Sequence, residues 1–486
     1  MSERIRTSPL SAVLAAAAPL SVRVVPSRSA VAIDPTVTSV TFDSRAVTTG
    51  SMFFCLRGDR SDGHAFAQAA VDAGASVLVV DHEVAIDGVA AQVVVSDTRR
   101  AMGPLSAAYF DHPSSTLQVI GVTGTNGKTT TAHILAATLE ALGRSTGVIG
   151  TLSGALTTPE APDLQRRLAD FRDEGRVAVA MEVSSHALAL DRVGGTRFRV
   201  AVFTNLGHDH LDLHGTQERY FAAKARLFES SLSDHGVVNI DDVHGQLLVD
   251  TAQVPMSTYS AADASDVVVG PFEHSYTWRG HRLRVGLGGR FNVLNSLAAA
   301  TTLGVLGHTP ADIAGAISAT APVRGRFEPV ETGQPFTVVV DYAHTPDALA
   351  EVLAAARGIT AALVIVVFGC GGDRDRDKRP QMGRAAAMSA DVIVVTSDNP
   401  RSEDPAAIIN DIIAGVPADY RGRIAVEPER HQAIEVALRA AGRGDVVVIA
   451  GKGHETTQTF AASVAPFDDH AVARELLETM NKEPRL

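Results

Sequence analysis

The chain has 486 residues, of which 45% are hydrophobic and 20% are charged, and its formal net charge is −12 at pH 7. This length exceeds a single ordinary hydrophobic core and predicts about three domains. The acidic balance argues against general nucleic-acid binding, which requires cations that neutralise phosphate, but it allows a nucleotide to bind at a local site.

The first 21 residues combine early arginines with an alanine-rich stretch between Pro9 and Pro19. Their order superficially resembles a signal peptide, but the apolar segment is mostly alanine and fits one short amphipathic helix. No stretch approaches the ~18 apolar residues of a membrane span. The two cysteines, Cys55 and Cys370, are too few for a disulfide framework and lack metal-ligand spacing. We therefore expect a cytoplasmic protein without a membrane span.

Apolar runs rich in β-branched residues alternate with Ala- and Leu-rich segments along almost the whole chain, which predicts an α/β fold. Buried strands are expected at 77–80, 93–95, 119–122, 177–180, 200–203, 338–340, 363–367, 392–395 and 446–449. Helices are expected at 130–142, 347–356 and 431–441.

Two polar breaks that contain proline, at 110–118 and 319–335, divide this alternation. They predict three domains: a small N-terminal α/β domain at 1–112, a central domain at 113–321 and a C-terminal domain at 322–486. The central domain should have a P-loop-type, parallel-rich sheet, and the C-terminal domain should be Rossmann-like.

A phosphate-binding loop is predicted where "VIGVTGTNGKTTTAHILAATL" joins a strand, a Gly-rich turn and an amphipathic helix. Gly124 and Gly127 let backbone N–H groups converge on phosphate, and the helix N-terminus favours the anion. Lys128 can reach the β/γ-phosphates and Thr129 can bind Mg²⁺. The strict G-x-x-x-x-G-K-[ST] pattern is broken because Val122 stands at the first glycine position. Gly-rich turns also occur without nucleotides, but the strand, the lysine and the run of threonines favour phosphate.

Further motifs follow this loop in a fixed order. They are "MEVSSHAL" (181–188), "FTNLGHDHLDLHG" (203–215), "YFAAKARLF" (220–228), "GRFNVLNSLAA" (289–299), "VRGRFEPV" (323–330), "DYAHTPDAL" (341–349), "FGCGGDRDRDKRPQMG" (368–383), "SDNPR" (397–401) and "AGKGHE" (450–455). Together with "GTNGKTT" they resemble the Mur ligase family, from Thr41 to about Gln458. The resemblance implies an ATP-dependent ligase of peptidoglycan precursor synthesis, which forms an amide through an acyl phosphate and releases ADP and phosphate. Within the family, the motifs resemble the members that add the third residue of the stem peptide.

Four residues, Lys128, Glu182, His210 and Lys224, are implied as catalytic. Glu182 follows a predicted strand and Thr129 opens a helix, so this pair can bind Mg²⁺; His210 and Lys224 complete the implied metal set. Alone, a histidine at a strand end is more often structural, and a lysine on an amphipathic helix normally extends into solvent. The resemblance implies instead that Lys224 is carbamylated to N6-carboxylysine, which requires a desolvated, uncharged amine.

The resemblance also assigns two sets of substrate contacts. ATP contacts are expected from Gly124, Thr125, Asn126, Gly127, Lys128, Thr129, Thr130, Asn292, Asn295, Arg326, Asp341 and His344, with Phe291 beside the adenine. UDP-N-acetylmuramoyl-L-Ala-D-Glu is expected to contact Phe42, Ser44, Asp59, Arg60, Ser61, Thr157, Thr158, Ser184 and Arg192. Two departures concern this second set: Leu190 stands where the family commonly has glutamine, and 151–165 is short.

The stretch "TSDNPR" ends a predicted strand and by itself indicates a turn. Within the resemblance, Asp398, Asn399, Pro400 and Arg401 are expected to bind meso-diaminopimelate together with Arg374, Gly451 and Glu455. Arg401 can grip the distal carboxylate, which lysine lacks, in a bidentate manner.

The alternatives are the same reaction with L-lysine, a folylpolyglutamate-synthase-like ligase, and a regulatory protein that binds nucleotide without turnover. A pterin-type substrate would leave the first domain and its "DSR" stretch (43–45) without a role, and a pure binder would need no second-metal residues. We expect a monomer that acts on these small molecules and binds no nucleic acid.

Overall fold

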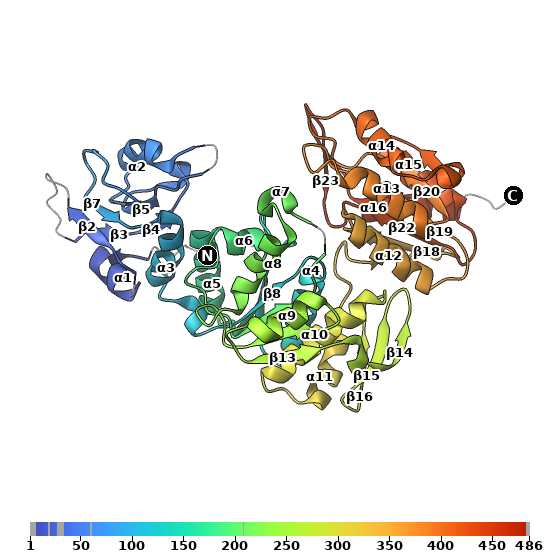
Figure 1. Cartoon of the computed structure of the whole chain (residues 1–486), viewed down its shortest axis with the longest axis horizontal. Coiled ribbons are helices and arrows are strands. Elements are labelled where there is room, and N and C mark those ends of the chain that lie inside the picture. The colour runs from blue at the N-terminus through green and yellow to red at the C-terminus, as the bar shows by residue number, and fades with distance from the viewer. Residues whose placement is uncertain (1–5, 18–19, 27–33, 59–60, 208, 483–486) are drawn as a thin grey trace.

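The computed structural model describes residues 6–17, 20–26, 34–58, 61–207 and 209–482. Figure 1 shows three lobes in a row, with the central lobe between the N-terminal lobe in blue and the C-terminal lobe in orange and red. Each lobe has its own sheet and its own hydrophobic clusters, as the α/β alternation predicted. The largest sheet of each lobe lies within one of the three predicted segments. The residues at which these segments begin and end remain a prediction. Among the described helices, none combines the length and the apolar character that crossing a bilayer requires.

The N-terminal lobe contains a five-stranded sheet in the order β2-β7-β6-β5-β4. Its strands are β2 (Arg23–Pro26), β4 (Ser39–Thr41), β5 (Ser51–Phe54), β6 (Val77–Val80) and β7 (Ala91–Val94), and β1 (Ser8–Pro9) pairs separately with β3 (Thr36–Val37). The helices are α1 (Leu10–Ala16), α2 (Ala67–Asp72) and α3 (Thr98–Tyr109). The predicted short N-terminal helix and both predicted strands are therefore confirmed. All residues of β5 and β6 are buried, which explains their uninterrupted apolar sequences.

The central lobe contains a six-stranded, wholly parallel sheet in the order β13-β12-β11-β8-β10-β9. Its strands are β8 (Gln118–Thr123), β9 (Thr146–Ile149), β10 (Ala178–Glu182), β11 (Val200–Phe203), β12 (Gly236–Asn239) and β13 (Met256–Tyr259). The helices are α4 (Lys128–Ala141), α5 (Ala161–Asp173), α6 (Ser185–Ala189), α7 (Leu211–His214), α8 (Gln217–Ala225), α9 (Val243–Thr251), α10 (Phe291–Val305) and α11 (Pro310–Ala316). Because the strands are parallel, the carboxyl ends of β8, β10 and β11 meet at one edge, where ligands of such sheets bind.

A second, antiparallel sheet of the central lobe was not predicted. It consists of β14 (Ser265–Val269), β15 (His274–Trp278) and β16 (His281–Val285). Buried residues alternate with less buried ones along β15, so its sequence carries no continuous apolar run. Arg279 and Gly280, both at positive φ, form the turn that joins β15 to β16.

The C-terminal lobe contains a six-stranded sheet in the order β17-β18-β22-β19-β20-β21, parallel except for β17 at one edge. Its strands are β17 (Glu328–Pro329), β18 (Thr337–Asp341), β19 (Val364–Phe368), β20 (Val392–Val395), β21 (Ile424–Val426) and β22 (Val446–Ala450), and β23 (Thr457–Thr459) pairs with β24 (Val464–Pro466). The helices are α12 (Pro346–Gly358), α13 (Lys378–Ser389), α14 (Pro405–Ala414), α15 (Arg430–Ala440) and α16 (Asp469–Lys482). The strands and helices predicted for this lobe are confirmed to within about two residues at each end.

A buried ion pair fixes the carboxyl ends of two of these strands. Arg430 and Asp469 have no exposed side-chain surface, and the Arg430 guanidinium donates to both Asp469 oxygens at 2.8 and 2.7 Å. The same guanidinium donates to the carbonyl of Ala450 at 2.9 Å and to that of Ser397 at 3.3 Å. Ala450 ends β22 and Ser397 lies two residues past β20, so one arginine connects both strand ends.

We expect Asp469→Ala to lower the free energy of opening of β22 by about 3–5 kcal/mol, because Arg430 would remain buried without its counter-charge. Hydrogen exchange of the β22 amides in increasing urea measures this free energy. The control is Glu435→Ala, which removes an exposed i,i+4 pair with Arg439 and should cost about 0.5 kcal/mol or less. Equal effects of the two substitutions would contradict a structural role for the buried pair.

Candidate active site

The loop between β8 and α4 requires glycine at two positions. Gly124 has φ 144° and Gly127 has φ 84°, in the region that favours glycine. A Cβ atom on Gly124 would lie 1.9 Å from the Thr204 hydroxyl, and one on Gly127 would lie 2.3 Å from the Asn295 amide oxygen. Because the N-cap Gly127 has no side chain, the first N–H groups of α4 have no side-chain cap. The helix start can therefore receive an anion.

Lys128 folds back over this loop. Its ammonium donates to the carbonyls of Gly124 at 3.0 Å and Thr125 at 2.7 Å. Burial lowers the pKa of Lys128, and the nearby carboxylates of Glu182 and Asp209 oppose that effect. The amine is thereby held at the position where a phosphate chain would cross the helix start.

Glu182, the last residue of β10, is buried beside Thr129. The Thr129 hydroxyl donates to the Glu182 carboxylate at 2.8 Å, and the backbone N–H of Thr151 donates to its other oxygen at 2.7 Å. Arg326, from the segment that leads into the C-terminal lobe, donates to the Thr129 hydroxyl at 3.1 Å. A hydroxyl and a carboxylate at the phosphate loop form the hard oxygen donor set that Mg²⁺ prefers, so the residues present fit that ion.

Lys224 lies on α8, and its side chain points inward rather than into solvent. Its residue exposure is 1%, and its amine donates to the Gly124 carbonyl at 2.8 Å and lies 4.5 Å from the centre of the Tyr220 ring. Burial holds the pKa of Lys224 well below its ordinary value, Lys128 lowers it further, and Asp209 opposes both. The site therefore favours the uncharged amine that carbamylation requires.

His210 precedes α7 with φ 55°, in the left-handed region. Its ring lies 4.6 Å from that of His186 and its Nε2 atom lies 3.4 Å from an oxygen of Asp209. Burial lowers the pKa of His210 to about 4 although Asp209 opposes the shift. A neutral imidazole is the form that binds a metal ion.

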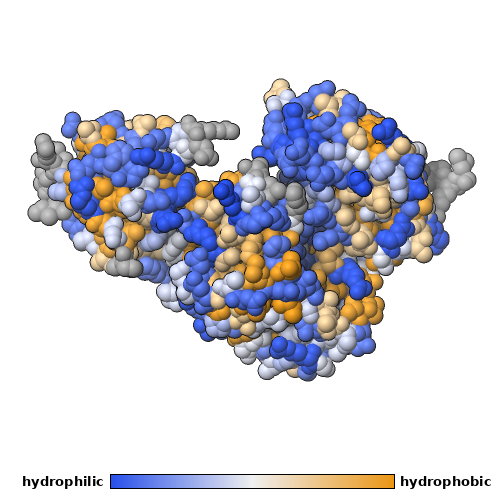
Figure 2. Space-filling view, in the orientation of Figure 1, coloured by the Kyte–Doolittle hydropathy of each residue, from blue (hydrophilic) through white to orange (hydrophobic). Residues whose placement is uncertain are grey.

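Residues of the central and C-terminal lobes line one cleft with the phosphate loop. From the central lobe these include Thr157, Ser184, Phe291 and Asn295, and from the C-terminal lobe Arg326, Asp341, Tyr342, His344 and Glu351. Figure 2 shows the outer lobes rising on either side of a hollow above the central lobe. The Arg326 guanidinium lies 4.5 Å from the centre of the Tyr342 ring, and its Nε atom is buried without a partner. Such a donor is available to an anionic ligand.

Several predicted nucleotide residues also have structural partners. Asp341 accepts the backbone N–H groups of Phe327 at 2.7 Å and Ala343 at 2.8 Å, and burial raises its pKa. Asn295 donates to Asn292 at 2.9 Å, and Asn292 donates to the carbonyl of Gly288 at 2.6 Å. These contacts order the first turn of α10. The ring of His344 donates through Nδ1–H to the Tyr342 carbonyl at 2.8 Å.

The residues predicted to contact the muramoyl dipeptide form a connected group. Thr158 donates to the carbonyl of Glu182 at 2.9 Å and accepts the N–H of Ser184 at 3.0 Å. Arg192 donates to the Thr158 carbonyl at 3.3 Å and forms an ion pair with Glu160 at 2.9 Å. Thr157 lies 3.1 Å from Thr151, which joins this group to Glu182.

The predicted nucleotide-sugar residues lie on the N-terminal lobe, outside the cleft lining. Phe42 is half-buried, and Ser44 begins a 3₁₀ turn that Asp43 caps. Ser61 is exposed, and its carbonyl accepts the N–H of Gly58 at 3.0 Å. Asp59 and Arg60 lie outside the described residues.

The predicted amino-acid pocket lies at the carboxyl ends of β20 and β22 and centres on Lys452, which sequence reasoning missed. This lysine has no exposed side-chain surface; its amine lies 3.1 Å from the Asn399 amide oxygen, 3.2 Å from Glu455 and 3.6 Å from Asp398. Asn399 also donates to Glu455 at 2.7 Å. Asp398 is buried, yet its Oδ1 atom accepts no hydrogen bond in the described structure. That oxygen can receive a cationic group of a ligand.

Arg401 forms the outer part of this pocket. It is half-buried with φ 52°, and it donates to the Gly372 carbonyl at 2.6 Å. Arg374 is exposed and lies two residues after Gly372. Gly451 lies against Asp398, because a Cβ atom on Gly451 would be 3.0 Å from that carboxylate. Pro400 is buried and ends the turn.

The structure thus brings the predicted residues together in three groups rather than one. The phosphate loop, Glu182, His210, Lys224, Arg326, Asp341 and His344 surround the cleft; Asp398 to Arg401 with Gly451 and Glu455 form the pocket; Phe42, Ser44 and Ser61 lie on the N-terminal lobe. Tyr342 lies between the first two groups, with its ring 5.0 Å from that of His454, which precedes Glu455. No role was predicted for Tyr342 and His454, although both lie inside the motifs "DYAHTPDAL" and "AGKGHE". The signal that could have identified them is their position beside charged residues in those motifs.

Comparisons with known proteins agree with this arrangement. Three family models match the chain: "Mur ligase family, catalytic domain" at 36–110, "Mur ligase middle domain" at 122–303 and "Mur ligase, glutamate ligase domain" at 325–453. A Streptomyces avermitilis protein named UDP-N-acetylmuramoyl-L-alanyl-D-glutamate–2,6-diaminopimelate ligase is 46% identical over 92% of this chain and 93% of its own length. A Geobacillus kaustophilus protein of the same name is 45% identical over 91% and 95%. A solved structure of that name is 34% identical, covers 92% and 96%, and superposes with a TM-score of 0.64.

Proposed function

The chain belongs to the Mur ligase family, and we propose that it joins meso-diaminopimelate to UDP-N-acetylmuramoyl-L-Ala-D-Glu at the expense of ATP. The names of its relatives support this reaction, including the amino acid that is added. The structural observation that carries the proposal is Lys224, a buried amine within 2.8 Å of the phosphate-loop carbonyl of Gly124. A protein that only binds nucleotide has no need of such a group.

The reaction requires two displacements at the cleft. An oxygen of the D-glutamate carboxylate attacks the γ-phosphorus of ATP, ADP leaves, and an acyl phosphate forms. The amine of diaminopimelate then attacks the acyl carbon; phosphate leaves with the bonding electron pair, and the nitrogen loses a proton. Catalysis of these steps rests on positioning and on stabilising charge at the phosphate.

Each group of cleft residues has a separate task in this scheme. Lys128 and the N–H groups at the start of α4 hold the β/γ-phosphates, and Arg326 approaches from the C-terminal lobe through Thr129. Thr157, Thr158, Ser184 and Arg192 hold the dipeptide end, and Asn292, Asn295, Asp341 and His344 hold the nucleoside side. Ser44 and Ser61 contact the uridine diphosphate on the N-terminal lobe.

Mg²⁺ would be held by Thr129, Glu182, His210 and the carbamylated Lys224. When bound, it supplies positive charge that stabilises the transferring phosphoryl group. Addition of CO₂ to the uncharged Lys224 amine converts that amine into an anionic carboxylate ligand. The depressed pKa of Lys224 supports this modification, because only the unprotonated amine attacks CO₂.

The pocket at β20 and β22 matches the charges of meso-diaminopimelate. Buried Asp398 offers an oxygen that accepts no hydrogen bond within the described residues and has only the Lys452 ammonium nearby, at 3.6 Å, while Arg401 and Arg374 present cations to a carboxylate at the more open side. L-lysine has no distal carboxylate, so it would leave Arg401 without that partner. A folylpolyglutamate-type substrate is disfavoured because it would leave the N-terminal lobe without a ligand.

We further propose that the enzyme is a cytoplasmic monomer, since its reaction consumes ATP and its cysteines are free.

The proposed reaction is tested by phosphate release from ATP and UDP-N-acetylmuramoyl-L-Ala-D-Glu with meso-diaminopimelate, L-lysine or L-ornithine in separate reactions. We expect release with meso-diaminopimelate that depends on the muramoyl dipeptide. Release with L-lysine alone would contradict the amino-acid assignment and leave the ligase assignment intact. Absence of release with all three amino acids would contradict both.

Replacing Lys224 tests its carbamylation. We expect Lys224→Ala to lower kcat by about 10²-fold or more, because one charge at the transferring phosphate is lost, and short carboxylates should restore part of the activity. Wild-type enzyme equilibrated with ¹³C-bicarbonate should show a carbamate carbon resonance that is absent from the variant. Lys482→Ala, at the exposed end of α16, is the control. Full activity of Lys224→Ala would exclude the proposed role.

Replacing Arg401 tests the carboxylate contact. We expect Arg401→Ala to raise the KM for meso-diaminopimelate by about 10-fold or more, as loss of charged hydrogen bonds predicts, with the KM for ATP within about twofold. Arg401→Lys keeps the charge but not the bidentate geometry and should have an intermediate effect. Arg443→Ala changes an exposed arginine of the same lobe and is the control. Unchanged KM values for both substrates would refute the assignment.

A further inference from the structure

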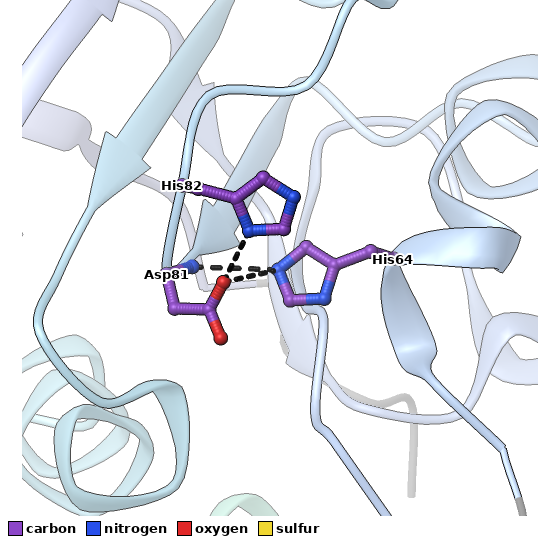
Figure 3. A group of neighbouring side chains, drawn as sticks. All are labelled: His64, Asp81 and His82. Carbon is purple, nitrogen blue, oxygen red and sulfur yellow. Dashed lines mark hydrogen bonds and ion pairs between the residues drawn. The ribbon is translucent and has the colours of Figure 1, made fainter.

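Three side chains on the N-terminal lobe converge on one point away from the cleft. His64 belongs to the 3₁₀ turn Gly63–Phe66, and Asp81 and His82 follow β6. Figure 3 shows both imidazole rings beside the Asp81 carboxylate. One nitrogen of each histidine and one oxygen of Asp81 all lie within 4.8 Å of one another. The proposed ligase reaction uses none of these residues.

The hydrogen bonds of His64 indicate which of its ring nitrogens carries the proton and which carries the lone pair that a metal ion needs. Its Nδ1 atom lies 2.6 Å from an Asp62 oxygen, which can only accept a hydrogen bond when ionised. Its Nε2 atom accepts the backbone N–H of Asp81 at 3.4 Å. The proton therefore lies on Nδ1, and the lone pair lies on Nε2, where an ion would have to replace the long 3.4 Å contact from the Asp81 N–H. Histidine ligands of metals commonly have this arrangement, in which a carboxylate orients the ring from behind.

The spacing and burial of the group suit a metal ion. The Nε2 atom of His64 lies 3.4 Å from Oδ1 of Asp81, close to the separation of about 3.4 Å that two ligands have around tetrahedral Zn²⁺ with bonds of about 2.0–2.1 Å. The His64 side chain is only 7% exposed and is therefore fixed, whereas that of His82 is 53% exposed. The His82 ring, which contacts the same Asp81 oxygen through Nδ1, can thus turn to make room for an ion.

We propose that His64 Nε2, an oxygen of Asp81 and His82 Nδ1 bind one divalent transition-metal ion of the Zn²⁺ type, with solvent at the remaining position. Two imidazoles and one carboxylate favour zinc and its neighbours over Mg²⁺ and Ca²⁺, which prefer oxygen ligands throughout. This site is separate from the Mg²⁺ ligands of the cleft, which come from the central lobe.

Arg57 forms an ion pair with the Asp81 carboxylate and would compete with the metal ion for it. Its Nε atom lies 2.7 Å from Oδ2 of Asp81 and its Nη2 atom donates to Oδ1 at 3.2 Å. The arginine side chain is 63% exposed, so it can move into solvent when the ion binds. The ion and the guanidinium compete, because Arg57 Nη2 donates to the same Oδ1 atom of Asp81 that faces both histidines. Arg57 therefore weakens metal binding, and its removal should strengthen it.

Calorimetric titration of the full, untagged chain with Zn²⁺ tests the proposal. Excess Mg²⁺ is present throughout to occupy sites made of oxygen ligands. We expect the wild-type protein to bind one more equivalent of Zn²⁺ than the double variant His64→Gln/His82→Gln. The control His281→Gln removes an exposed histidine of β16 and should leave the stoichiometry unchanged. An unchanged stoichiometry in the double variant would overturn the proposal.

Two single variants separate a built site from adventitious binding. Asp62→Asn should weaken Zn²⁺ binding by about 10–100-fold, as loss of an orienting carboxylate does at other metal sites. Arg57→Gln should tighten it, a gain that partial unfolding cannot produce. Weaker binding to Arg57→Gln than to the wild type would contradict the competition, and with it the assignment of Asp81 as a ligand.

Discussion

Two lysine amines share one backbone carbonyl, and the arrangement of the cleft depends on that contact. Lys128 and Lys224 donate to the Gly124 oxygen at 3.0 and 2.8 Å, from helices that begin 89 residues apart in the sequence. Two buried ammonium groups that donate to the same carbonyl oxygen lie close together and repel each other strongly. The pKa values of both lysines are lowered by burial, and the charge of Lys128 lowers that of Lys224 further. The packing of α8 against the loop thus brings the Lys224 amine beside Lys128 and favours the uncharged form of Lys224.

The geometry of Gly124 makes this contact possible. Its φ of 144° turns the carbonyl toward the lysines, and the Thr204 hydroxyl fills the space that a Cβ atom would need. The parallel pairing of β8 with both β10 and β11 places Glu182 and Thr204 at the same sheet edge as the loop. A sheet of this topology therefore supplies the carboxylate, the glycine turn and the helix start together.

Much of this could be predicted from the sequence, since parallel strands buried on both faces are continuous apolar runs and a phosphate loop has a local pattern. The antiparallel strands at 265–285 were missed because exposed and partly buried residues interrupt the buried ones and the alternation includes His, Tyr and Arg. Lys452 and Arg430 were missed for another reason. Charged residues in a sequence are expected at the surface, and only the fold shows that Asp398, Glu455 and Asp469 surround these two cations. The grouping of predicted site residues into a cleft and a pocket likewise follows from which strand ends are neighbours.

The buried cations of the C-terminal lobe lie beside the two acids of the predicted amino-acid pocket. Lys452 lies within 3.6 Å of both Asp398 and Glu455, and Arg430 connects the segments that precede Asp398 and Gly451. These cations offset the mutual repulsion of the two carboxylates, and the Asp398 Oδ1 atom, 3.6 Å from Lys452, accepts no hydrogen bond in the described structure. Under the proposed function, the interior of the pocket would receive a positive group, and Arg401 and Arg374 would receive a negative one at its mouth. An amino acid with an ammonium and a carboxylate at its distal end matches this polarity, and one with a distal ammonium alone satisfies only the interior half.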